Sequence, residues 1–350
     1  MTIADIARMA GVSVSSVSNY FNRPGRVGAA TAARIRAAVA KTGFVPDVHR
    51  PGPKTGERIG VKTGNIAFLH PGGGLLRRFL ARPGIPRLLE GIERALEARR
   101  LRLLLLGAGE GGALPENFDS RSCDGLIVYG GALPVSAEGL LRGVRMVSCC
   151  GVPEEGGATD PLVTWDGVRA GEIAAEFLFR QGHRRVAVFN PDATDAEYRR
   201  RAAGFRRIAH SCRMEVTEFS VPGISAHSPA VANRILAGRF LHGPNAPTGA
   251  FFCSDGALTG VWRELGGGAR GLELRHVIGC GADDAALIQL APRPATVDLC
   301  FEEVGHRTVE LLCALLRGEE PPGRAVIVRP VLRPGRFGES QSVSKSQVER

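Results

Sequence analysis

The sequence predicts two parts: an all-α N-terminal module with a helix-turn-helix arrangement, and a two-lobed α/β region built on parallel sheets. Three observations predict this fold class. Near the N-terminus, apolar residues recur at helical spacing on both sides of Gly11. From Gly64 onward, short apolar runs alternate with amphipathic helical stretches, as buried parallel strands and their connecting helices do. These runs are too numerous for one sheet in a chain of 350 residues, which favours two lobes.

The first two helices are predicted to be short and joined by a tight turn. Thr2 can cap a helix that ends at Gly11, because glycine takes a positive φ at no steric cost. Ser13 can cap a second helix over 14–21, whose outer face carries small polar side chains. Such a helix can enter the DNA major groove. The alternative is a helical hairpin that only packs.

The distribution of charge favours the DNA-binding interpretation. The first 50 residues contain seven Arg or Lys residues and two Asp residues, a net charge of +5. The whole chain has a formal net charge of +10, so half of the excess lies in its first seventh. This asymmetry is expected where a protein neutralises nucleic-acid phosphates.

A third helix is expected over 29–42, where it would cover the first two and end at Gly43. The stretch that follows contains two prolines and a glycine within three residues, poor material for a helix, and is predicted to be a linker. We therefore place a helix-turn-helix domain at 1–45, a hinge at 46–62, the α/β region at 63–333 and a disordered polar tail at 334–350.

The apolar runs of the α/β region predict its strands, and the amphipathic stretches between them predict its helices. Buried strands are expected at 65–69, 101–106, 126–129, 146–149, 186–189, 250–253 and 277–280. Helices are expected at 87–99, 167–181, 196–209, 228–237 and 302–316. In a doubly wound architecture of this kind, ligands bind at the carboxyl ends of the strands.

The sequence also argues against several classes of protein. No run of about 18 apolar residues is present, so no transmembrane helix is expected. The N-terminus lacks the pattern of a secretory signal peptide, so we expect a cytoplasmic protein. The eight cysteines show no CxxC spacing, and no coherent catalytic constellation is found. We expect no metal, no other cofactor and no enzymatic activity.

Two segments carry a family resemblance. TIADIARMAGVSVSSVSNYFN and TAARIRAAVAKTGFVP match, almost position for position, the DNA-binding headpiece of the lactose-repressor/galactose-repressor family of bacterial transcription factors. More loosely, RLLEGIERALEARRLRLLL, CDGLIVYG, FLFRQGHRRVAVF, RAAGF, SDGALTG and GRAVIVRPVLR resemble landmarks of that family's effector domain. The resemblance covers 2–332 and implies a periplasmic-binding-protein-like fold for the α/β region.

The resemblance implies that Val14, Ser15 and Asn19 contact bases. Val14 can touch a thymine methyl group, and Asn19 can pair with adenine N6 and N7. The family often has arginine where Asn19 stands, so a less common operator is expected. Alternatively, Val14 packs at the helix start and Asn19 is simply solvated. Phosphate contacts are expected from hydroxyls, an amide and one cation near helix ends, at Thr2, Ser13, Ser18, Asn22, Arg26 and Thr31.

In the family, the linker folds on the operator into a hinge helix that inserts a leucine into the minor groove. This sequence has Pro53 at that position. Either the hinge stays extended or Pro53 itself acts as the wedge, since proline is among the apolar residues used in this way.

The resemblance also assigns an effector site. Arg201 matches the family's arginine that holds a sugar hydroxyl or a carboxylate with its fork of donors. Trp165 would suit stacking on a sugar ring. The candidates besides Arg201 lie at or near the ends of strands, and for all of them a structural turn or cap is the alternative role: Ser254, Asp255, Asp283, Trp165 and Asp166.

These observations predict a sequence-specific DNA-binding transcriptional regulator. We expect a repressor that binds a palindromic operator as a homodimer and responds to a small-molecule, sugar-like effector in the cleft between the lobes. Two alternatives stay open: an architectural DNA binder without an effector, and a cytoplasmic solute-binding protein or sugar enzyme of the same α/β architecture.

Overall fold

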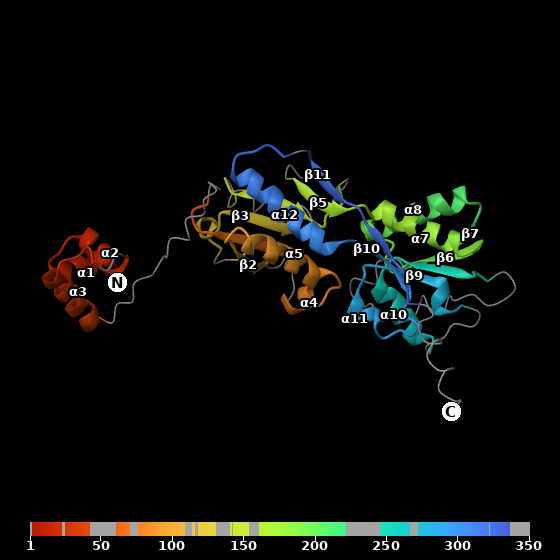
Figure 1. Cartoon of the computed structure of the whole chain (residues 1–350), viewed down its shortest axis with the longest axis horizontal. Coiled ribbons are helices and arrows are strands. Elements are labelled where there is room, and N and C mark those ends of the chain that lie inside the picture. Colours follow the sequence, from red (N-terminus) through yellow and green to blue (C-terminus); the bar gives the residue numbers. More distant parts are fainter. Residues whose placement is uncertain are drawn as a thin grey trace, which may run out of the picture. The chain divides into compact units, whose positions relative to one another are not determined.

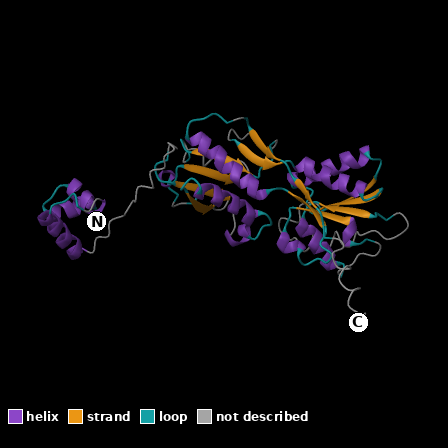
Figure 2. Ribbon diagram, in the orientation of Figure 1, coloured by secondary structure: helices purple, strands orange, loops and turns teal. Residues whose placement is uncertain are grey.

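The computed structural model describes residues 2–22, 25–42, 61–70, 76–108, 114–115, 118–130, 141, 143–153, 161–221, 246–266, 272–321 and 323–336. The chain divides into two compact units, Met1–Gly56 and Glu57–Arg350, and each is described by itself. Figure 1 follows the elements along the chain and Figure 2 shows their secondary structure.

The N-terminal unit consists of three helices around a small apolar core. These are α1 (Ile3–Ala10), α2 (Val14–Asn22) and α3 (Ala29–Thr42), which confirms the predicted helices to within one residue. Ile6, Val17 and Ile35 supply one fully buried side chain from each helix, joined by three small alanines. These few buried side chains pack the three helices together.

In the second unit, one six-stranded sheet forms the first lobe. Its order is β11-β5-β4-β3-β1-β2, and every pairing in it is parallel. The strands are β1 (Asn65–His70), β2 (Arg102–Gly107), β3 (Gly125–Tyr129), β4 (Arg145–Cys149), β5 (Leu162–Trp165) and β11 (Ala325–Val328). The helical segments of this lobe are α4 (Leu76–Leu80), α5 (Ile85–Glu97), the 3-10 turn η2 (Ser120–Ser122) and α12 (Phe301–Leu316).

A second six-stranded sheet forms the second lobe, with the order β12-β10-β9-β8-β6-β7. The strands are β6 (Arg185–Asn190), β7 (Glu215–Ser220), β8 (Gly249–Phe252), β9 (Val277–Cys280), β10 (Ala295–Asp298) and β12 (Val331–Arg333). Its helical segments are α7 (Gly167–Arg180), α8 (Ala196–Ser211), α10 (Asp255–Glu264), the 3-10 turn η3 (Leu274–His276) and α11 (Asp284–Leu287).

Both sheets are buried on two faces, as their apolar runs predict. In β6, Val186 and Val188 pack in the core that includes α7 and α8, whereas Ala187 and Phe189 pack in the core that includes α10. This alternation follows from the two-residue period of a strand. Helices on both faces of a mostly parallel sheet confirm the predicted α/β architecture.

The chain passes between the lobes at three places. These crossings follow β5, β10 and β11, since the next element in each case belongs to, or packs on, the other sheet. The crossing after β10 includes Cys300, which has a positive φ of 57° and precedes α12 directly. The two lobes are therefore joined by three short segments close to the ends of these strands.

The structure differs from the predicted elements in two respects. It contains five strands that the apolar runs did not indicate, β5, β7, β10, β11 and β12, and β12 pairs antiparallel with β10. These strands are short or partly polar, so they lack a long apolar run. The predicted helix at 228–237 lies outside the described residues.

Candidate DNA-binding surface and effector site

Local hydrogen bonds fix both ends of α1. The Asp5 backbone N–H donates to Thr2 Oγ1 (3.3 Å), and the Thr2 N–H donates to Asp5 Oδ2 (2.9 Å). The Thr2 N–H and the Thr2 hydroxyl, which both donate to Asp5 Oδ2 at 2.9 Å, hold the pKa of Asp5 below its usual value. At the other end Gly11 has φ 60°, and its carbonyl accepts from Arg34 of α3 (3.4 Å). The predicted cap at Thr2 and stop at Gly11 are confirmed, and they set the turn that leads into α2.

Ser13 caps α2 as predicted. Its Oγ accepts from the Ser16 backbone N–H at 3.1 Å, and Val17 is buried on the inner side of the helix. The first turn of α2 consequently points outward: Val14 is 52% exposed and Ser15 is exposed, while Asn19 one turn later is half-buried. The three residues predicted to read bases thus lie at or near the accessible start of one helix, the part of a recognition helix that contacts base edges.

The residues predicted to contact phosphate occupy different positions in this unit. Arg26 is exposed and Thr31 lies half-buried in the first turn of α3, whereas Thr2 and Ser13 are used as helix caps. Ser18 is half-buried in α2. The side chain of Asn22 and the whole of Pro53 lie outside the described residues.

In the second unit, Arg201 lies on α8 and is buried, with 6% of its surface exposed. Its Nη1 donates to the carbonyl of Cys253 (2.7 Å), which follows β8 directly. Its guanidinium carbon lies 5.2 Å from the Tyr198 ring centre and 6.0 Å from that of Trp165, at the end of β5. Arg201 and Trp165 are therefore brought together where the strand ends of both lobes meet.

Glu197 stands one helical turn before Arg201 and was not predicted as a site residue. One of its oxygens, Oε2, accepts a hydrogen bond from Trp165 Nε1 and lies 3.8 Å from Arg201 Nη2. Burial raises the pKa of Glu197, although Arg201 and the Trp165 hydrogen bond act in the opposite direction. The sequence did contain a signal for this pair: Glu197 and Arg201 are four residues apart on one predicted helix, a spacing at which an acidic and a basic side chain can interact.

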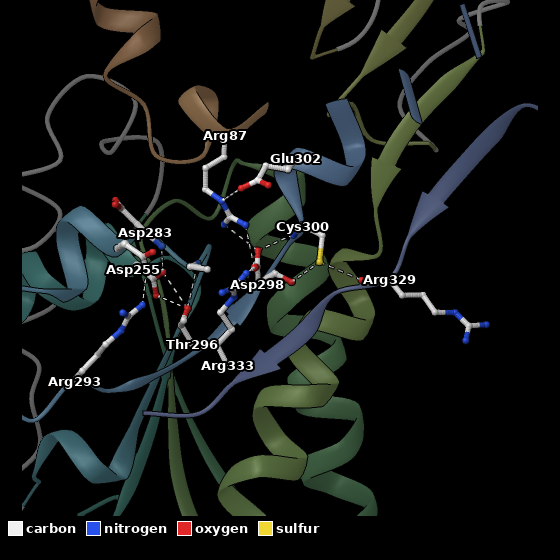
Figure 3. Close-up of polar contacts among 12 residues, drawn as sticks. Arg87, Asp255, Asp283, Arg293, Thr296, Asp298, Cys300, Glu302, Arg329 and Arg333 are labelled. Carbon is white, nitrogen blue, oxygen red and sulfur yellow. Dashed lines mark hydrogen bonds and ion pairs between the residues drawn. The ribbon is translucent and has the colours of Figure 1, made fainter. Parts of the chain in front are cut away.

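The predicted strand-end residues of the second lobe form a compact polar group. Asp255 accepts a hydrogen bond from the Asp283 backbone N–H (2.8 Å) and from the Thr296 hydroxyl (2.8 and 3.0 Å), as Figure 3 shows. Burial raises the pKa of Asp255 to about 7 despite these bonds. Ser254 caps α10 by accepting from Ala257 N–H, and its side chain is hydrogen bonded to Tyr198.

Two of the predicted residues serve as helix caps. Asp283 Oδ1 accepts from Ala286 N–H at the start of α11, and Asp166 Oδ1 accepts from Arg169 N–H at the start of α7. Both are partly accessible at strand ends. The structure thus gives Asp283 and Asp166 the capping role that the sequence left as an alternative.

A second polar network joins the two lobes. Asp298, at the end of β10, is 1% exposed and accepts from Arg87 of α5 through both oxygens, at 3.1 Å each. Arg333 of β12 also donates to Asp298 (2.6 Å), and Glu302 binds Arg87 (3.3 Å), as Figure 3 shows. Burial alone would raise the pKa of Asp298, but the hydrogen bonds from Arg87 and Cys300 N–H hold it below its usual value. An ion pair therefore spans the lobes beside the crossing after β10.

The residues that the structure describes include neither a candidate metal site nor a helix that could span a membrane. No group of three or more His, Cys, Asp or Glu side chains among them is arranged to hold a metal ion. None of their helices has both the length and the apolar character needed to cross a membrane.

Comparison with known proteins identifies two matching families. Residues 2–47 match the family described as bacterial regulatory proteins, lacI family, and residues 175–336 match a periplasmic binding protein-like domain. These are the two parts that the resemblance predicts from the sequence, in the same order.

Individual proteins match over different lengths. The chain is 30% identical to the maltose regulon regulatory protein MalI of Escherichia coli strain K12 over 214 residues, which is 59% of this chain and 58% of MalI. It is 26% identical to the HTH-type transcriptional regulator GntR of Pseudomonas aeruginosa over 334 residues, 91% of this chain and 90% of GntR. The match thus spans less than two thirds of MalI and most of GntR.

The fold is shared with solved structures. The crystal structure of the Lac repressor dimer bound to operator and the anti-inducer ONPF superposes with a TM-score of 0.63 at 17% identity, covering 96% of this chain and 98% of the other. With its N-terminal helix-turn-helix and its two-lobed α/β region, the chain belongs to the lacI family of bacterial regulatory proteins.

Proposed function

We propose that this protein is a transcriptional repressor that reads a specific DNA operator and is controlled by a small-molecule effector. The observation that carries the proposal is the accessible start of α2, where Val14 and Ser15 are exposed within a strongly basic unit. The family assignment supports it, because both named relatives are regulatory proteins.

In this proposal, Asn19 gives most of the base specificity. An amide can accept and donate in one plane, which suits the N6 and N7 edge of adenine, whereas Val14 suits a thymine methyl group and Ser15 is less selective. The exposed Arg26 and the hydroxyl of Thr31 neutralise or bind phosphates and position the helix without specifying sequence.

We further propose that the protein acts in the cytoplasm as a homodimer on a palindromic operator. One small headpiece makes few base contacts, so that two copies on two half-sites are needed for tight binding. The Lac repressor, which shares the fold, is a dimer in its operator complex. The two-fold symmetry of such a dimer predicts an inverted repeat in the DNA.

The proposed effector is sugar-like and binds beside Arg201. This arginine is buried at the strand ends with two aromatic rings within 6.0 Å, a combination of polar donors and flat apolar faces that suits a sugar ring. The three crossings between the lobes allow a bound ligand to shift their relative angle. Such a shift would change the spacing of two headpieces and hence their fit to two half-sites.

Selection of bound sequences from a random DNA pool, repeated at several salt concentrations, tests this proposal. We expect enrichment of a palindrome with two half-sites. Recovery of unrelated sequences with one steep salt dependence would contradict it, because that result indicates attraction to phosphates alone and an architectural DNA binder.

A further inference from the structure

Resting on the proposed function, we infer that the effector is a neutral polyhydroxyl compound and that Glu197 excludes phosphorylated or carboxylated ligands from the site of Arg201. The position of Glu197 carries this inference. Its carboxylate lies on the same face of α8 as Arg201, and it is 9% exposed.

Glu197 already forms ion pairs with both arginines that an anionic ligand would need. Arg201 Nη2 is 3.8 Å from Glu197 Oε2, and Arg200 Nε is 3.6 Å from Glu197 Oε1. Asp255, a further carboxylate, is close enough to Arg201 for their charges to interact. An arriving phosphate or carboxylate would therefore face Glu197 in a poorly solvated site, and like charges in such a position repel strongly.

Two buried polar atoms of the Arg201–Glu197 pair make no hydrogen bond among the described residues. They are Arg201 Nε, which can only donate, and Glu197 Oε1, which as a carboxylate oxygen accepts and whose ion-pair contact with Arg200 Nε, at 3.6 Å, is longer than a hydrogen bond. A buried polar atom without a hydrogen bond is unfavourable. A hydroxyl group can satisfy both atoms because it accepts and donates, whereas a carboxylate or an unprotonated phosphate oxygen can only accept. Neighbouring hydroxyls on a sugar ring match such a donor and acceptor pair.

The surroundings hold the Glu197 carboxylate in this place. Trp165 Nε1 donates to its Oε2, so that the end of β5 fixes one oxygen. Gly167, at the start of α7, leaves the room that the carboxylate fills: a Cβ there would lie 2.7 Å from Glu197 Oε2. Contacts from two other elements thus position Glu197 for ligand selection, beyond its pairing along α8.

Calorimetric titration of the full chain tests the inference. The probes are D-ribose, D-glucose and maltose, each beside its phosphate ester. We expect at least one neutral sugar to bind and its ester to bind about tenfold more weakly or worse. Glu197→Gln keeps the size of the side chain and removes its charge, so it should reduce this ratio by about tenfold. Glu303→Gln removes an exposed carboxylate of α12 and should leave the ratio unchanged.

Each outcome decides a separate point. A phosphate ester that binds as tightly as its sugar, or more tightly, would overturn the inference while the proposed effector site stands. An unchanged ratio in Glu197→Gln would overturn the role of Glu197. Failure of every probe at millimolar concentration would contradict the sugar-responsive function itself. If circular dichroism shows that Glu197→Gln does not fold, the comparison of each sugar with its ester in the unaltered protein still tests whether anionic ligands are excluded.

Discussion

Two buried aspartates have pKa values that their surroundings shift in opposite directions. Asp255 and Asp298 are each about 1% exposed, at the strand ends of the same lobe. Asp298 receives two arginines, which lower its pKa, whereas Asp255 receives a backbone N–H and a hydroxyl, and burial raises its pKa to about 7. Burial disfavours the charged form of each carboxyl group. Nearby arginines outweigh this effect at Asp298, whereas the neutral donors at Asp255 offset it only in part.

These pKa shifts predict opposite pH dependences of stability. For Asp255 the folded state favours the protonated form, so its contribution is present below pH 4 and is lost as the pH rises through about 7, by up to about 4 kcal/mol. For Asp298 the contribution is present above pH 4 and is lost as the pH falls. Urea titrations from pH 3 to 8 should show the wild type losing stability with rising pH relative to Asp255→Asn, and gaining it relative to Asp298→Asn. The same slope for both variants would refute the assignment.

Arg201→Ala should abolish the response to effector and leave operator affinity intact. The guanidinium is the buried donor group of the proposed site, and it lies in the other compact unit from α2. Fluorescence anisotropy of a labelled operator, with and without a sugar that binds the wild type, measures both properties. Arg199→Ala removes an equal charge from the exposed side of the same helix and serves as the control. Retained ligand-dependent release in Arg201→Ala would count against this site.

A close contact between helices α7 and α8 positions Arg201. Gly171 of α7 and Gly204 of α8 face each other's backbones: a Cβ at Gly171 would lie 1.8 Å from the Arg201 carbonyl oxygen, and one at Gly204 would lie 1.9 Å from that of Val168. The two helices can approach this closely only because neither position has a side chain. Their packing fixes the turn of α8 that carries Arg201.

Gly204→Ala is therefore expected to lower the free energy of unfolding by about 2 kcal/mol or more and to weaken effector binding, since the methyl group must push the helices apart. Gly256→Ala is the matched control. It also lies in a helix, but the nearest atom to its added Cβ would be 3.6 Å away, an ordinary contact. Urea titration and calorimetry of both variants measure the two effects, and equal stability of the two would be inconsistent with the close contact.

The ion pair between the lobes predicts a further difference between two arginines of α5. Arg87→Ala leaves the buried Asp298 with one arginine fewer and should cost about 2 kcal/mol of stability. Arg94→Ala breaks pairs of exposed groups with Glu90 and Glu302 and should change stability by less than about 0.5 kcal/mol. Thermal unfolding of the two variants compares them directly. A larger loss of stability in Arg94→Ala than in Arg87→Ala would contradict the importance of the ion pair between Arg87 and Asp298.

The elements differ in how far the sequence predicts them. The seven expected strands are all present, because each contains an apolar run. Six of them have a neighbour on both sides in their sheet, and β2, which lies on an edge, has the leucine run 103–106. β7 escaped prediction because Glu215 and Glu218 interrupt its pattern on an edge of the sheet, and β12 because it is three residues long and exposed. Short edge strands are set by pairing with a neighbour, which local composition does not encode.

The site was predictable to a similar extent. Caps and turns are local, so Thr2, Gly11 and Ser13 follow directly from the sequence. Arg201 and Trp165 are 36 positions apart, and their meeting depends on the packing of α8 against the end of β5. Arg87 and Asp298 are still more distant in the chain, and only the tertiary structure brings them together.

The chain combines a basic helix-turn-helix unit, proposed to read DNA, with a two-lobed unit proposed to bind a small-molecule effector. Charge alone would give the first unit affinity for any DNA, whereas an operator requires that α2 distinguish bases. We therefore expect Asn19 and its neighbours at the start of α2 to determine the sequence preference of the protein.

The most direct test is selection from a random DNA pool with the wild type and Asn19→Ala in parallel, followed by affinity measurements across salt concentrations. We expect the variant to lose its preference at one symmetry-related base pair in each half-site, a change of about 1–3 kcal/mol in binding free energy there. The salt dependence should stay the same, because the side chain is uncharged. Identical selected sequences for the two proteins would show that Asn19 does not read a base.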